Sequence, residues 1–144
     1  MADLTAHLAA TFRRWADQLG KARAGTLDAP FPPDQLPAEN LRAVRDFCGD
    51  PLHELTRHAH RLLSSVGRAD ELIGHQRGPI PAGLQVMFGL NELAVHHDDL
   101  ARAAGSSYRS CGDVVAALAT MYRAVHGMPA GPDPWACLLQ ATGR

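Results

Sequence analysis

The residues best suited to chemistry in this chain lie in one segment, NELAVHHDDLARAAG, over residues 91–105. Glu92 and His96 are four residues apart, which on an α-helix places their side chains about 40° apart on one face. Asp99 follows within about 60° of His96 on the same side. Apolar residues flank this face, so we expect both groups to point inward, where a charge must be paired or bound to a metal. The flanking residues are Phe88, Leu93, Val95 and Leu100, whereas Asn91, Asp98 and Arg102 are expected to be solvated.

An inward Glu-x-x-x-His pair offers one oxygen and one nitrogen to a cation. A divalent metal needs at least one more protein ligand, which a neighbouring helix must supply. His7 is the candidate from the residues alone, because it borders the apolar stripe of the first periodic segment beside Leu4 and Thr11. Two alternatives stay open: Glu92 and His96 form an ordinary ion pair, and His7 is a partly exposed boundary histidine.

The other histidines are weaker candidates. The segment HELTRHAHRLL has HExxxH spacing and not the HExxH spacing of zinc proteases, which excludes that class. His97 points about 100° away from His96 and is no obvious co-ligand. In the HELTRHAHRLL segment we expect His58 to be half-buried and the polar side to be solvated; that side consists of His53, Arg57, His60 and Ser64.

These residues must be positioned by helices, because apolar side chains recur at helical spacing through most of the chain. Asp50 followed by Pro51 is typical of a helix start, and Gly105 of a helix end. No strand-length run of alternating β-branched residues is present. We therefore predict a single all-α domain over residues 1–144, a bundle with three or four main helices. The expected helices span residues 2–24, 38–47, 51–73, 82–104 and 111–125, with a short last helix at 135–142.

Composition restricts the possible partners and compartment. The chain of 144 residues is 46% hydrophobic and carries 14 basic and 15 acidic residues, so we expect neither nucleic acid nor a membrane as partner. The first residues lack the pattern of a signal peptide, which favours the cytoplasm. Lys21 is the one lysine among the basic residues, which indicates a GC-rich, actinobacterial genome. The cysteines Cys48, Cys111 and Cys137 lack CxxC spacing and are expected to be reduced and at least partly buried.

Several segments together carry a resemblance to a known family. NELAVHHDDLARAAG resembles the E-x-x-x-H-G-W-D-L-A-x-A-x-G signature of the mycothiol-dependent maleylpyruvate isomerase family, within the DinB-like superfamily. MADLTAHLA resembles that family's DLVAHLA segment, and DPWACLLQATGR resembles its LL-x-x-x-GR ending. The resemblance implies a DinB-like helical bundle with His7, Glu92 and His96 as ligands of a divalent metal, zinc most often and nickel in some members. It also implies a low-molecular-weight thiol, mycothiol in actinobacteria, as cosubstrate.

The chain departs from the family pattern in two places. The family has a helix and a P-C-P-G-W turn before the DLVAHL segment, and here the chain starts at that segment. We therefore expect the first helix of the usual bundle to be missing or replaced, either by the helix at 111–125 or by a second subunit, which predicts a homodimer or a repacked bundle. The G-W of the signature is His97-Asp98, so the wall of the substrate pocket is expected to differ.

Three protein ligands leave coordination positions open, as in catalytic metal sites. We therefore favour an enzyme, a thiol-dependent transferase or isomerase in which the metal binds a thiol or polarises a small electrophilic substrate. Asp99 is expected to assist catalysis by orienting a ligating histidine; the alternative is a surface ion pair with Arg102 or another arginine. Two other functions stay open, a non-catalytic homodimeric module that binds a metal or ligand, and a purely structural bundle.

Overall fold

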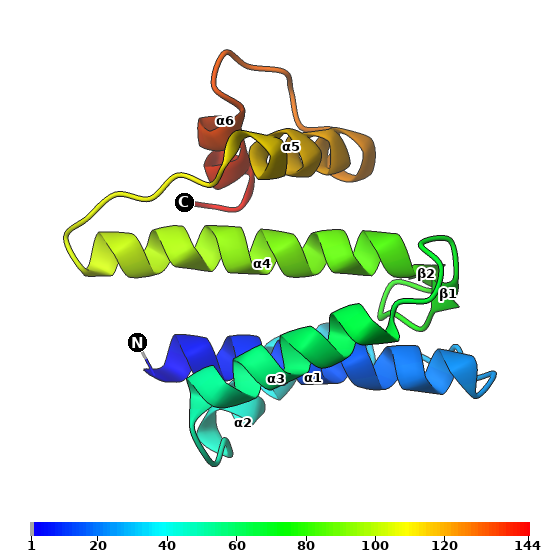
Figure 1. The fold of residues 1–144 in the computed structure, drawn as a ribbon. Coiled ribbons are helices and arrows are strands. Elements are labelled where there is room, and N and C mark those ends of the chain that lie inside the picture. The colour runs from blue at the N-terminus through cyan, green and yellow to red at the C-terminus, as the bar shows by residue number, and fades with distance from the viewer. Residues whose placement is uncertain (1) are drawn as a thin grey trace. The chain divides into compact units, whose positions relative to one another are not determined.

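The protein is mostly helical, which confirms the prediction of an all-α helical bundle. The computed structural model describes residues 2–144. Four of the α-helices in this range have 15 residues or more, and the one sheet among the same residues has two strands of two residues each. The chain forms two compact units, divided between Val86 and Met87, and each unit is described by itself (Figure 1). The predicted single domain over residues 1–144 stays a prediction.

The first unit is built on α1 (Ala2–Arg23), which packs against α2 (Leu36–Arg45) and α3 (Pro51–Ser65) (Figure 1). A short 3₁₀ helix, η1 (Pro33–Gln35), leads into α2. The core is apolar, as the helical periodicity of α1 predicts. Its fully buried members include Leu8, Phe12, Ala16, Leu19, Leu62 and Ile73.

Helix α3 begins as the sequence predicts and ends early. Asp50 caps it by accepting hydrogen bonds from the backbone N–H groups of Leu52 (2.9 Å) and His53 (3.3 Å). The predicted end at residue 73 is wrong, because α3 stops at Ser65.

The segment after α3 has a different structural role. Strand β1 (Leu72–Ile73) pairs with β2 (Ile80–Pro81) in antiparallel register. The carbonyls of Glu71 and Ala69 accept hydrogen bonds from the N–H groups of Ala82 (2.7 Å) and Gly83 (2.8 Å), the first residues of α4 (Ala82–Ala103). The segment therefore satisfies backbone donors that the start of a helix leaves free.

The second unit contains the rest of α4 with α5 (Gly112–His126) and α6 (Pro134–Ala141). Helices α5 and α6 pack against each other through a core that includes the fully buried Leu118 and Leu138. Asp133 caps α6, accepting from the N–H groups of Trp135 (3.0 Å) and Ala136 (3.3 Å). Helix α4 ends before Gly105, which adopts the left-handed conformation (φ +71°), as the sequence predicts.

Two expectations about burial are wrong. Leu52 and Leu63 are among the apolar side chains that recur at helical spacing in the predicted 51–73 helix, yet they are 65% and 62% exposed. Cys48 and Cys111 are exposed and only Cys137 is partly buried; all three are free thiols. Within residues 2–144, no helix combines the length and apolar character needed to cross a bilayer.

Candidate metal centre

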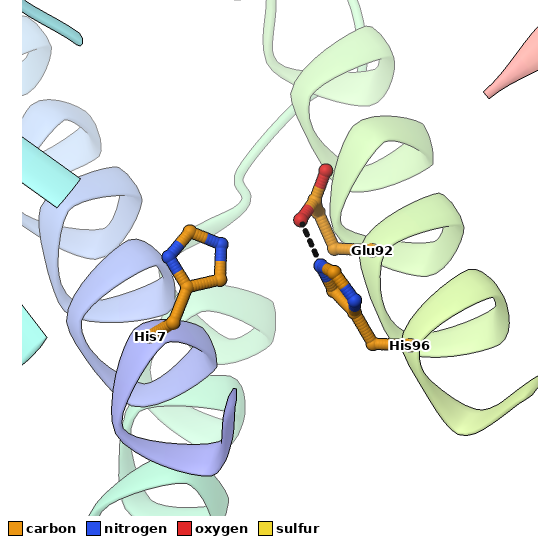
Figure 2. Close-up of side chains that lie close together, drawn as sticks. All are labelled: His7, Glu92 and His96. Carbon is orange, nitrogen blue, oxygen red and sulfur yellow. Dashed lines mark ion pairs between the residues drawn. The ribbon is translucent and has the colours of Figure 1, made fainter. Parts of the chain in front are cut away.

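Glu92 and His96 form an ion pair on the part of α4 that belongs to the second unit (Figure 2). His96 Nε2 lies 3.3 Å from Glu92 Oε2, and the two side chains are 15% and 31% exposed. Their four-residue spacing along the helix brings them together, as the sequence predicts. The pair places one nitrogen and one carboxylate oxygen side by side in a partly buried environment.

The other nitrogen of the His96 ring is held by Asp99. His96 Nδ1 lies 2.8 Å from Asp99 Oδ2, so the Nδ1–H group donates a hydrogen bond to the carboxylate. The predicted role of Asp99 requires this contact, because a hydrogen bond at Nδ1 fixes the ring and directs Nε2 toward Glu92. Hydrogen bonds to Glu92 and then Asp99 raise the pKa of His96, and partial burial opposes this rise.

Asp99 is also paired with Arg144, at the C-terminal end of the sequence. Arg144 Nε lies 3.1 Å from Asp99 Oδ1, and Nη2 lies 2.9 Å from Oδ2. The hydrogen bonds from Arg144, and next from His96, lower the pKa of Asp99. Both options weighed for Asp99 are therefore present at once: it binds His96 and forms an ion pair with an arginine.

Sequence reasoning left the identity of that arginine open, and Arg102 has a different partner. Arg102 Nε lies 2.7 Å from Asp98 Oδ2. Arg144 is more than forty residues away from Asp99 in sequence, so the pattern of one helix could not indicate it. The only sequence signal was the terminal Gly-Arg of the family-like ending.

Two residues near the site were placed wrongly on the solvent side of the helix. Asn91 and Asp98 are only 8% and 4% exposed. Asn91 forms a hydrogen bond with Tyr122 of α5, and burial raises the pKa of Tyr122 more than this bond lowers it. This hydrogen bond joins α4 to α5 within the second unit.

His7 comes from the first unit, where it lies on α1 between the buried residues Ala6 and Leu8. Its side chain is partly buried, which agrees with a boundary position. Figure 2 draws His7 with the pair on α4. In the second unit the structure brings Glu92, His96 and Asp99 together, and His7 is the predicted site residue that belongs to the other unit.

The remaining histidines have other surroundings. His97 stacks on Tyr108 with ring centroids 3.8 Å apart, so its predicted separation from His96 is confirmed. His53 and His60 are exposed, as predicted. His58 is only 3% exposed, so the expectation of a half-buried side chain is wrong.

A second Glu-x-x-x-His pair occurs on α3, where sequence reasoning did not recognise it. His58 Nε2 lies 3.4 Å from Glu54 Oε2, nearly the same separation as in the pair on α4. Here, however, Arg57 Nη2 lies 3.1 Å from the same ring nitrogen, and His58 Nδ1 has no hydrogen-bond partner among the described residues. Sequence spacing therefore does not distinguish the two pairs. They differ in the second ring nitrogen, which is bound by the Asp99 carboxylate in His96 and has no such partner in His58.

Comparison with known proteins gives no relative. No family model matches the chain, no curated protein matches it, and no solved structure matches it. The family resemblance of the short motifs therefore stays a prediction.

Proposed function

We propose that this protein binds one divalent metal ion through His7, Glu92 and His96 and uses it in thiol-dependent chemistry. The observation that carries the proposal is the environment of His96, whose ring is held at Nδ1 by Asp99 and faces a glutamate at Nε2. Histidine ligands of metals in proteins almost always donate their second N–H to such an oxygen acceptor. An isolated ion pair needs no such third group.

The donor set suits a divalent transition metal. Two imidazoles and one carboxylate are the ligand types that zinc and nickel accept in proteins, and all three side chains are partly buried. Figure 2 shows the three side chains that this proposal assigns to the ion. Zinc is the expected metal and nickel the alternative.

The protein residues have separate roles in this proposal. A divalent ion with three protein ligands supplies Lewis acidity and open positions for a thiol or a carbonyl oxygen. Asp99 keeps the Nδ1 proton of His96 in place, so that the Nε2 lone pair is free for the ion. Arg144 keeps Asp99 ionised, because its guanidinium lowers the pKa of that carboxyl group.

The reaction class comes from the family resemblance. We infer a transferase or isomerase that joins a low-molecular-weight thiol, mycothiol in an actinobacterial cytoplasm, to a small electrophilic substrate. We infer a homodimer as the working form, as the sequence analysis predicts. The second candidate is a non-catalytic metal-binding module. It is favoured by His97, which replaces the family's glycine and stacks on Tyr108.

Metal analysis of the purified full chain tests the proposal. We expect about one zinc or nickel ion per chain, and loss of that ion in His7→Ala, Glu92→Gln and His96→Ala. Glu54→Gln is the matched control, because it changes the second Glu-x-x-x-His pair, and it should keep the ion. Full occupancy in the three site variants would exclude these ligands.

Activity and mass complete the test. Thiol transfer to a panel of small electrophiles should depend on the bound ion, and the native mass should be twice the 15.5 kDa of one chain. Metal-loaded protein that is inert toward all thiols and electrophiles would favour the binding module.

A further inference from the structure

The first unit contains a cavity of about 500 Å³ that the proposed metal site does not use. Residues of α1, α2 and α3 line it, together with Pro30 and Phe31 from the loop after α1 and Phe47 and Cys48 from the loop after α2. Its volume falls within the range typical of small-molecule sites.

The carboxylates that line this cavity all have arginine partners. Each of the four acidic side chains forms an ion pair, so their negative charges are compensated within the protein. The pairs are Asp17 with Arg61 (2.8 Å), Glu39 with Arg42 (2.8 Å), Asp46 with Arg45 (2.8 Å) and Glu54 with Arg57 (3.2 Å).

Two further arginines line the cavity without a carboxylate partner among the described residues. Arg14 donates only to the neutral amide oxygen of Asn40 (3.1 Å), and its guanidinium lies 4.7 Å from the centre of the Phe31 ring. Partial burial lowers the pKa of Arg14, which nevertheless remains a cation at neutral pH. Arg13, the other arginine, is exposed beside it. Glu39 also attracts the Arg14 guanidinium. Counted together with the arginines that pair with its four carboxylates, the cavity still has two more arginines than carboxylates, Arg13 and Arg14.

His58, a buried histidine of α3, also lines this cavity. His58 is 3% exposed, and burial lowers its pKa, so the ring is neutral. Arg57 Nη2 lies 3.1 Å and Glu54 Oε2 lies 3.4 Å from His58 Nε2. His58 Nδ1 is buried and has no partner in the described part of the chain. Because this nitrogen is closed to solvent, His58 forms part of the cavity wall and makes no contact with a ligand in our proposal.

We propose that this cavity binds a small organic anion, a molecule with a carboxylate or phosphate group next to an apolar ring or chain. The oxygens of the anion accept hydrogen bonds from Arg14 and compensate the charge of Arg13. The apolar part lies against Phe31 and Phe47. The site rests on residues of the first unit only and is independent of the proposed metal centre.

Titration calorimetry of the full chain with benzoate and with phenyl phosphate tests the site and distinguishes the two anion types. We expect saturable binding of at least one anion at one per chain, and no binding of benzyl alcohol, the neutral analogue. Arg14→Gln should weaken binding at least tenfold, whereas the exposed Arg123→Gln should change it less than twofold. Equal affinity of the wild type and Arg14→Gln, or equal affinity for inorganic phosphate and phenyl phosphate, would overturn the proposal.

A second measurement works in the unmodified protein, even where Arg14→Gln fails to fold. Cys48 lines the cavity and is exposed, while the exposed Cys111 lies in the other unit. The bound anion should slow alkylation of Cys48 by iodoacetamide at least threefold and leave Cys111 unchanged, as read by peptide mass spectrometry. Absence of saturable binding by the wild type, or equal slowing at both thiols, would contradict the site.

Discussion

Asp99 is the residue whose position says most about the candidate centre. Its carboxylate lies between the His96 ring and the Arg144 guanidinium, 2.8 Å from His96 Nδ1 and 2.9 Å from Arg144 Nη2. In a metal site this arrangement raises the basicity of the other ring nitrogen, Nε2, which is the one that binds the ion. In a purely structural ion pair it has no such consequence.

Asp99→Asn should therefore weaken zinc binding roughly 10- to 100-fold, because the amide cannot hold the Nδ1 proton as the carboxylate does. Competition with a chromogenic chelator measures the affinity, and the melting temperature of metal-free protein is recorded alongside. Asp113→Asn, an exposed acid on α5, is the control and should leave the affinity unchanged. An unchanged zinc affinity in Asp99→Asn would show that Asp99 does not support a ligand.

The ion pair of Asp133 predicts how the stability of the fold depends on pH. Bidentate hydrogen bonds from Arg109 (2.8 and 3.0 Å), followed by backbone N–H groups of α6, lower the pKa of Asp133 to about 2. Because the folded pKa lies below the unfolded value, its stabilising contribution is present above about pH 4 and is lost as pH falls toward 2. Thermal melts followed by circular dichroism should show this loss, and Asp133→Asn should make the decline between pH 4 and 2 shallower. An identical decline in the variant would contradict this assignment.

Helical spacing predicted the Glu92–His96 contact because both residues lie on one helix, where angles follow from sequence. The burial of Asn91 and Asp98 was not predictable in this way. It depends on contacts with other elements, such as the hydrogen bond that Asn91 donates to Tyr122, and a single helix carries no information about them.

At the scale of elements, α3 shows which helix boundaries the local sequence predicts and which depend on tertiary contacts. Its start was predicted because Asp50 and Pro51 carry the chemistry of a helix start in their own side chains. Its end was not, since residues 66–73 pair with β2 and bind the first N–H groups of α4. Those partners lie further along the chain.

The neighbouring leucines of α3 test which face of the helix packs against α1. Leu62 is 1% exposed in the core of the first unit, and Leu63 is 62% exposed. Leu62→Ala should lower the free energy of unfolding by about 3 kcal/mol, because a cavity replaces buried methyl groups. Leu63→Ala should change it by less than about 0.5 kcal/mol. Urea denaturation measures both, and equal effects would mean that the packed face is assigned wrongly.

At the scale of the whole molecule, the central proposal is that His7, Glu92 and His96 bind one ion. His7 precedes the division at Val86, and Glu92 and His96 follow it. The ion would therefore stabilise the folded chain as a ligand that binds only the native state. No pattern within one helix could predict this combination; the apolar stripe of the first helix suggested His7, and the family resemblance implies the same three residues.

X-ray absorption spectroscopy of the zinc-loaded full chain tests this claim most directly, because it counts imidazole ligands. We predict two imidazole nitrogens and a carboxylate oxygen around zinc in the wild type, and one imidazole in His7→Ala loaded at high zinc concentration. His53→Ala, which removes an exposed histidine, should retain two. A single imidazole in the wild type, or two in His7→Ala, would contradict the account.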